Sequence, residues 1–181
     1  MNKNVIIKIN AYQITEGQKN HSDPVIAKGK YYFSNGCHYL FYSEYPNRAA
    51  ERAAIQTGAD RVNPGAAAER AANQQATSNG CISECSGNSA ERVSNRIEAR
   101  PGCILVKKSG SVTSQMEFNK DKDSTTKYST PFGTFTFGIH TKDMLIRAEK
   151  GTVTIEIDYS LYSNGSILSE NHIKISAKNL T

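Results

Sequence analysis

Apolar and polar residues alternate with a period of two through most of the C-terminal half of the chain. From Phe135 to Ile139 every second residue is apolar, and residues 153–161 repeat the pattern. This period is typical of a strand with one buried face. The run Met144–Ile146 predicts a separate short strand, and the turn sequence Ser163-Asn164-Gly165 predicts a hairpin that continues into a last strand over residues 167–177.

The N-terminal part predicts the same construction. Strands are expected over residues 5–12, 25–33 and 37–45, and Ser34-Asn35-Gly36 is a tight-turn sequence between the last two. No segment outside residues 46–92 has a helical period. The turns recur at intervals of about 8–12 residues, which is the spacing of a sandwich or a barrel. We therefore expect an all-β fold, a closed antiparallel barrel of about eight to ten strands.

Residues 46–91 break this pattern. They are rich in Ala, Asn, Gly, Ser and Arg, they contain Ala-Glu-Arg repeatedly, and they include no aromatic residue. Ala and charged residues favour short helices, but glycine and proline interrupt any long one. We expect a single domain over residues 1–181 in which this segment is a mostly flexible insertion at a hairpin tip. The alternative is a partner-binding loop.

The positive charge lies in the strand-rich part of the chain. The net charge is +5, and Lys28, Lys30 and the pair Lys107-Lys108 contribute to it. Basic β-surfaces with aromatic residues can bind single-stranded nucleic acid. Lysines also protect exposed strand edges, and the aromatic residues mostly alternate as core residues. The sequence favours this second role over a nucleic-acid partner.

The cysteines and the chain's hydropathy bear on its location and on metals. No apolar run approaches the roughly 18 residues of a membrane span, and the first residues lack the features of a signal peptide. We expect a cytoplasmic protein with reduced thiols and no membrane partner.

Cys81 and Cys85 have a spacing that a metal could use, but Cys103 is the only other thiol nearby and no His is close. Zinc sites normally show four ligands at tighter spacing, so neither a metal nor a cofactor is expected.

Residues that could do chemistry do not form a catalytic set in the sequence. The four histidines are isolated, and Cys37 and His38 are adjacent, so on a strand they point to opposite faces. Glu156 and Asp158 share one strand face, and paired carboxylates can do acid–base work. Because they alternate with apolar residues, a solvated outer face is favoured. An enzyme is not expected.

The segment from Tyr128 to Ile139 contains a Pro-Phe-Gly turn that leads into a strand. Its residues suit a barrel corner plugged by aromatic rings, and this structural role is favoured over a ligand site. The motif residues are Tyr128, Thr130, Pro131, Phe132 and Gly133.

Several motifs resemble those of one family, the YwiB-like small bacterial proteins, a domain of unknown function numbered 1934. The resemblance covers most of the chain except about residues 46–91, and it implies a lipocalin-like, calycin-type β-barrel. It implies no activity and no catalytic residues. The motifs lie at residues 29–33, 39–42, 101–110, 116–118, 128–133, 141–144 and 155–159.

Two functions remain open on the sequence. The first is non-catalytic binding of a small, partly apolar molecule in the barrel interior, since barrels of this size can hold one small ligand. Inward polar groups among the aromatic rings would indicate it. The second is a protein- or nucleic-acid-interaction module that acts through the basic outer surface or the inserted loop, which a filled interior would indicate. The candidate lining residues are Tyr31, Phe33, Tyr39, Phe41, Phe135, Phe137 and Tyr159.

Overall fold

The protein is an all-β structure. A computed structural model describes residues 2–44, 92–130 and 133–180, which form strands and no helix, and so contain no helix able to span a membrane. The expected insertion over residues 46–91 lies outside the described residues. The strands are β1 (Lys3–Thr15), β2 (Gln18–His21), β3 (Val25–Ser34), β4 (Cys37–Glu44), β5 (Val93–Arg100), β6 (Cys103–Ser109), β7 (Thr113–Phe118), β8 (Ser124–Thr130), β9 (Gly133–Glu149), β10 (Thr152–Ser163) and β11 (Ser166–Asn179).

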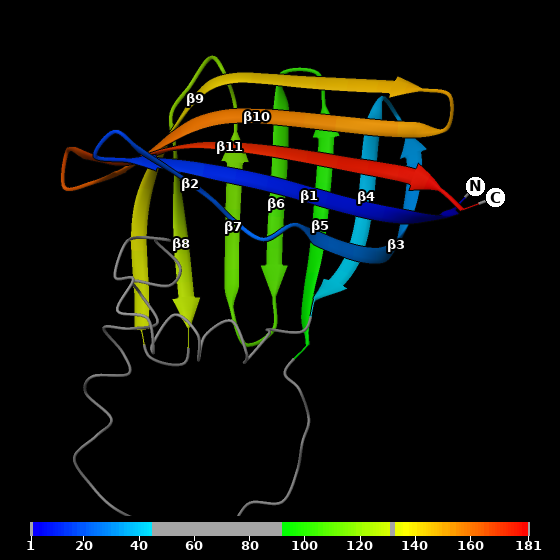
Figure 1. Cartoon of the computed structure of the whole chain (residues 1–181), viewed down its shortest axis with the longest axis horizontal. Coiled ribbons are helices and arrows are strands. Elements are labelled where there is room, and N and C mark those ends of the chain that lie inside the picture. The colour runs from blue at the N-terminus through cyan, green and yellow to red at the C-terminus, as the bar shows by residue number, and fades with distance from the viewer. Residues whose placement is uncertain (1, 45–91, 131–132, 181) are drawn as a thin grey trace, which may run out of the picture.

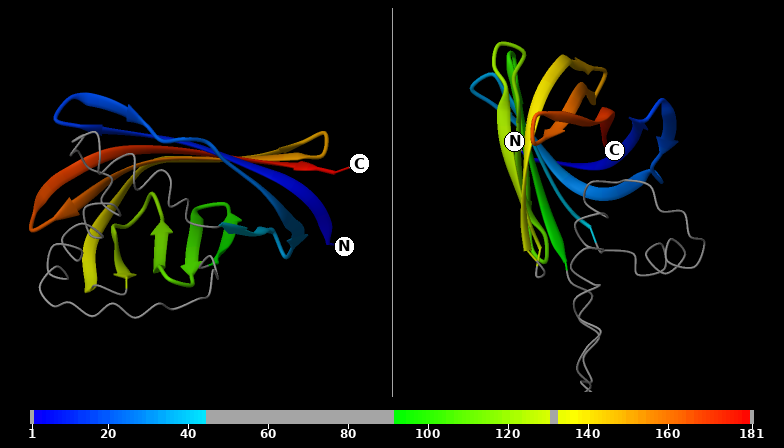
Figure 2. Two further views of the ribbon diagram at one scale, coloured as in Figure 1. Left: turned by 60° about the horizontal axis from the view of Figure 1, so that its bottom comes forward. Right: turned by 90° about the vertical axis from the view of Figure 1, so that its left-hand side faces the viewer.

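The strands form one antiparallel sheet that closes on itself. Neighbours in the sheet follow chain order from β3 to β11, and β1 pairs with both β3 and β11. β2 pairs only with the end of β1, so the other ten strands make the closed barrel. The wall of β5–β8 stands opposite the wall of β1, β10 and β11 (Figures 1 and 2). The expected barrel is confirmed.

Four of the hairpin turns share one backbone conformation. Asn35-Gly36 and Asn164-Gly165 have positive φ at both residues, with values of 50° and 73° in the first turn and 51° and 78° in the second. Glu16-Gly17 and Lys150-Gly151 have the same pattern. Two consecutive positive φ values match the right-handed twist of the flanking strands, which is why Asn and Gly are favoured there.

β9 differs from the sequence prediction. The separate strand expected over residues 144–146 is the second half of this one long strand. The first half pairs with β8, the second half with β10, and the β9–β10 register shifts at Asp158/Tyr159. In Figure 1 the strand rises beside β8 and then turns across the end of the barrel. The polar residues Thr141-Lys-Asp143 therefore mark a bulge, which bends a strand without ending it.

The barrel interior contains one continuous apolar cluster. Buried isoleucines, valines and leucines from β1, β4, β5, β6, β9, β10 and β11 contact one another there. Phe118 is fully buried and lies edge-on to the ring of Tyr159, with 4.9 Å between ring centroids. Burial of this apolar surface is the main term that stabilises the fold.

Gly29 marks the position where β3 changes partner. Residues 25–31 pair with β1, whereas residues 29–34 pair with β4. A Cβ atom on Gly29 would lie 2.5 Å from both the Ile7 Cδ1 and the Phe41 carbonyl oxygen. Only glycine allows the three strands to meet this closely. Beyond this corner the first half of β3 diverges from the end of β4, and a groove opens between them.

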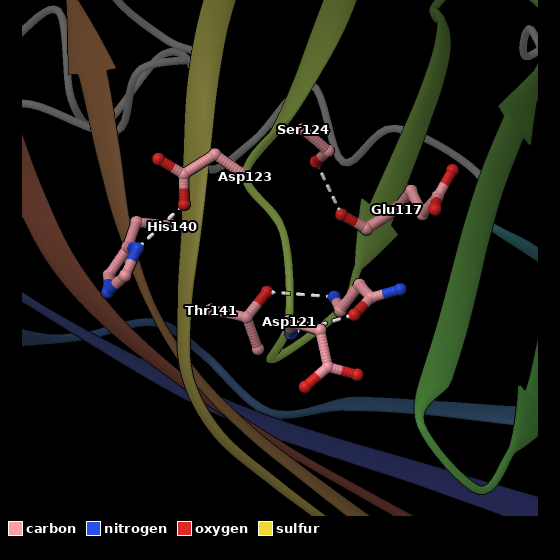
Figure 3. Close-up of polar contacts among 7 residues, drawn as sticks. Glu117, Asp121, Asp123, Ser124, His140 and Thr141 are labelled. Carbon is pink, nitrogen blue, oxygen red and sulfur yellow. Dashed lines mark hydrogen bonds and ion pairs between the residues drawn. The ribbon is translucent and has the colours of Figure 1, made fainter.

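Side chains hold the connection between β7 and β8. The two strands share only two residue pairs. Beyond them the Ser124 hydroxyl donates to the Glu117 carbonyl oxygen at 2.6 Å, and the Asn119 N–H donates to Thr141 Oγ1 at 3.1 Å (Figure 3). These contacts replace ladder hydrogen bonds that the diverging strands cannot make.

Thr141→Val is expected to lower the free energy of unfolding by about 1–2 kcal/mol, because the partly buried N–H group of Asn119 loses its acceptor while side-chain volume is kept. Thr141 is only 4% exposed. Urea denaturation would measure the change. His140→Ala is the matched control, since it removes only the exposed His140–Asp123 contact on the same loop and should have little effect. Equal losses in both variants would contradict the special role of the Thr141 hydroxyl.

Candidate functional site

Four of the seven candidate lining residues face the interior. Tyr31, Phe135 and Phe137 are partly buried on the inward face, and Tyr159 is 6% exposed. Phe33 has the same strand phase, but it lies at the end of β3 and is 54% exposed.

Tyr39 and Phe41 lie on the outer face, so their expected place in the lining is corrected. Their neighbours Leu40 and Tyr42 point inward and are 0% and 7% exposed. β4 carries apolar or aromatic residues on both faces, so alternation could not assign them. On the outside, the ring of Tyr32 stacks on Tyr39 at 4.5 Å and on Phe41 at 5.8 Å.

The described part of the Tyr128–Gly133 motif forms the end of the β8–β9 hairpin. Tyr128 faces inward opposite Phe135, and the Thr130 hydroxyl donates to the Gly133 carbonyl oxygen at 3.3 Å. Pro131 and Phe132 lie outside the described residues.

A row of polar side chains crosses the inner face of strands β4 to β8, near the end of the barrel where the β8–β9 hairpin turns. The strand register places its residues directly opposite one another, whereas the next inward row along the same strands is apolar. Sequence reasoning missed this row, although Asn95 interrupts the apolar phase of Val93, Ile97 and Ala99, which was a usable signal. The polar row is Tyr42, Asn95, Lys108, Ser114 and Tyr128.

The groove between β3 and β4 reaches this row. Its volume is about 1160 Å³, and Tyr42 and Asn95 line its inner side. Residues 25–28 of β3 line another side, and they have no ladder partner toward β4. The mouth carries charges of both signs from Lys28, Glu44 and Arg92. The arrangement combines unpaired backbone groups, apolar side chains and buried polar groups in one hollow.

Asn95 is the most unusual group in the groove. Its side chain is 2% exposed, and its Nδ2 donates to the Val93 carbonyl oxygen at a long distance of 3.5 Å. Its Oδ1 has no hydrogen-bond partner among the described residues. A buried acceptor without a donor costs about 1–3 kcal/mol, so such groups are uncommon in folded proteins.

Tyr42 lies directly opposite Asn95 in the ladder. Burial, with smaller contributions from the charge of Glu44 and a hydrogen bond to it, raises the pKa of Tyr42 far above its usual value. Its hydroxyl therefore keeps its proton at any physiological pH and can donate a hydrogen bond. At the mouth, Arg92 Nε donates to Ser43 Oγ at 2.9 Å.

Tyr31 and His38 form an inward pair further along β3 and β4. The Tyr31 hydroxyl lies 3.0 Å from His38 Nδ1. Burial raises the pKa of Tyr31 and lowers the pKa of His38. The lowered pKa favours the uncharged imidazole at neutral pH, and the tautomer of His38 decides which of the two groups donates.

The other groups considered for chemistry are engaged on the outer face. Glu156 contacts Lys174 at 2.8 Å, which holds the pKa of that carboxyl below its usual value, and Asp158 contacts His172 at 2.7 Å. The outer-face placement expected for both carboxylates is what the structure shows. Among the described residues no group of three metal-binding side chains comes together, and Cys81 and Cys85 lie outside them.

A family model for a domain of unknown function, DUF1934, matches residues 83–175. The chain belongs to the DUF1934 family. The crystal structure of ywiB protein from Bacillus subtilis is similar in fold, with a TM-score of 0.67 and 15% sequence identity over 99% of this chain and 94% of that chain. None of the curated proteins matches the sequence. The DUF1934 match includes Arg92, Ser94 and Asn95, whereas β3 and β4, which supply most of the groove, precede it.

Proposed function

We propose that this DUF1934 protein binds, without catalysis, a small and partly apolar molecule in the groove between β3 and β4. The ligand carries an N–H or O–H donor that meets Asn95 Oδ1. The buried acceptor without a partner is the observation that supports this proposal. Burying such a group is unfavourable by itself, and it becomes favourable when a ligand supplies the missing hydrogen bond.

The groove suits such a molecule better than the barrel centre does. Core side chains occupy the centre, whereas the groove has a volume of about 1160 Å³. Val25, Ala27 and Phe41 supply apolar contacts along it. Small-molecule sites commonly combine an apolar lining with a few placed polar groups.

The chemistry of the lining supports binding over turnover. The described residues that line the groove include no His and no Cys. Ser43 is held by Arg92 rather than by a general base. A nucleophile needs such a base within hydrogen-bond reach, and the base in turn needs a third group that orients it.

Asn95→Leu is expected to abolish ligand retention while raising the free energy of unfolding of the ligand-free protein by about 1 kcal/mol. Leucine keeps the side-chain volume and removes the acceptor that has no donor. Native mass spectrometry of the purified full chain would report retained molecules, and urea denaturation would report stability.

Thr126→Val is the matched control. Thr126 Oγ1 is also buried without a partner, but Thr126 does not line the groove. This variant should change stability in the same direction and retain the ligand. Absence of any co-purified molecule in the wild type, or equal retention by Asn95→Leu, would overturn the proposal.

A further inference from the structure

The outer face of β3–β6 carries aromatic and basic residues in adjacent rows. The register places Lys30, Phe41, Arg96 and Lys107 opposite one another in one row across the four strands. The next row begins with Tyr32 and Tyr39. Figure 1 shows these strands side by side, and in the right-hand view of Figure 2 their wall lies at the edge of the molecule with no described strand over it.

The aromatic rings on this face are already stacked in parallel. The planes of Tyr32 and Tyr39 differ by 16°, and those of Tyr32 and Phe41 by 14°. The Arg96 guanidinium lies 5.8 Å from the Tyr39 ring centroid and 5.6 Å from that of Phe41. Flat bases can extend such a stack, because every nucleobase has a π-face and guanidinium groups stack on the same surfaces.

The charge on this face is strongly positive. The outward positions of β3–β6 hold one carboxylate, Glu98, which pairs with Arg96 at 3.0 Å. The surplus of cations complements a polyanion. Because Lys30, Arg96 and Lys107 follow one row across the strands, the surface suits a continuous phosphodiester backbone better than isolated acidic side chains. The outward cations are Lys28, Lys30, Arg96, Arg100 and Lys107.

A hollow of about 310 Å³ lies beside Tyr39 on the same face. Leu105 and Cys37 give it an apolar side, and the carboxylates of Glu98 and Glu117 line it as well. Carboxylates accept hydrogen bonds from the amino groups of bases. The hollow therefore offers a place for one base next to the ring stack.

We propose that the outer face of β3–β6 binds single-stranded nucleic acid, with bases stacked on Tyr32 and Tyr39 and the phosphate backbone along Lys30, Arg96 and Lys107. This surface adjoins the groove, since Lys30 and Phe41 line both, whereas Tyr32, Tyr39 and Lys107 do not line the groove. The two sites can thus be tested one at a time.

Fluorescence anisotropy with the full chain and labelled 15-nucleotide single strands, one RNA and one DNA of the same sequence, tests the proposal. The double variant Tyr32→Ala/Tyr39→Ala is expected to weaken binding about tenfold or more, because it removes the stacking surface. Phe33→Ala is the control, since Phe33 is an exposed ring that belongs to neither of the two outer rows. This variant should bind like the wild type. Tighter binding of one of the two strands would identify the sugar that the surface prefers.

Charge reversal tests the backbone contacts. Arg96→Glu/Lys107→Glu should weaken binding and reduce the salt dependence of log Kd by about 1.4, since each lost single-strand phosphate contact contributes about 0.7. Lys150→Glu/Lys178→Glu changes the net charge equally at exposed positions away from this face, in the β9–β10 turn and on β11, and should have a smaller effect. No binding by the wild type at 50 mM salt, equal effects of the two charge reversals, or full binding by the tyrosine variant would each overturn the proposal.

Discussion

Phe118→Ala is expected to lower the free energy of unfolding by about 3–5 kcal/mol. Phe118 is fully buried and is the largest of the side chains with no exposed surface. Its ring lies against Tyr159, the residue on the opposite wall, with centroids 4.9 Å apart. Truncation removes apolar burial and leaves a cavity that two rigid walls cannot close. The midpoint of urea unfolding would measure the loss.

Two further variants keep this prediction decisive if Phe118→Ala fails to fold. Phe118→Leu should cost less than about 1.5 kcal/mol because most of the volume remains. Phe33→Ala removes the same group from a position that is 54% exposed and should cost well under 1 kcal/mol. A loss from Phe33→Ala as large as that from Phe118→Ala would contradict the assignment of the core.

Gly29→Ala is expected to lower the free energy of unfolding by about 2–3 kcal/mol. The added methyl group would lie 2.5 Å from the Phe41 carbonyl oxygen, which belongs to the backbone of the neighbouring strand and cannot rotate away. β3 would have to move from β4 or from Ile7 on β1. Thermal and urea unfolding would both show the change.

Gly138→Ala is the matched control on another strand. A Cβ atom there would lie 3.4 Å from Tyr162 Cβ, which is ordinary van der Waals contact. The change in stability should stay below about 1 kcal/mol, and the lower conformational entropy of the unfolded chain could make it favourable. If Gly29→Ala is no worse than Gly138→Ala, the corner at Gly29 is not held by close packing.

The strands and turns were largely predictable because their signals are local. Alternation over residues 153–161 and the Asn-Gly pairs of two turns depend only on neighbouring residues, and both predictions are confirmed. The strand expected over residues 144–146 was wrong as a separate element. A bulge and a turn look alike in sequence, and the cross-strand register of β9 and β10 distinguishes them.

The candidate site was less predictable because it depends on register. Alternation places Tyr39 and Phe41 on one face of β4 but does not say which face points inward. Phe41 pairs with Lys30 and Arg96, and directly paired residues share a face of the sheet, so Phe41 lies on the outer face with these two cations. Asn95 could have been noticed as a polar residue in an apolar phase, but its missing partner is visible only in the folded chain.

The seam between β1 and β11 joins the two strands that are farthest apart in the chain, through ten residue pairs. During synthesis, β1 leaves the ribosome long before its partner exists, so one of its edges stays open until almost the whole chain has been translated. Contacts of such high sequence separation form slowly, and open strand edges can pair with other chains. The seam is closed only in the finished barrel, so the nascent chain is the stage at which a cell would have to protect this edge of β1 from aggregation.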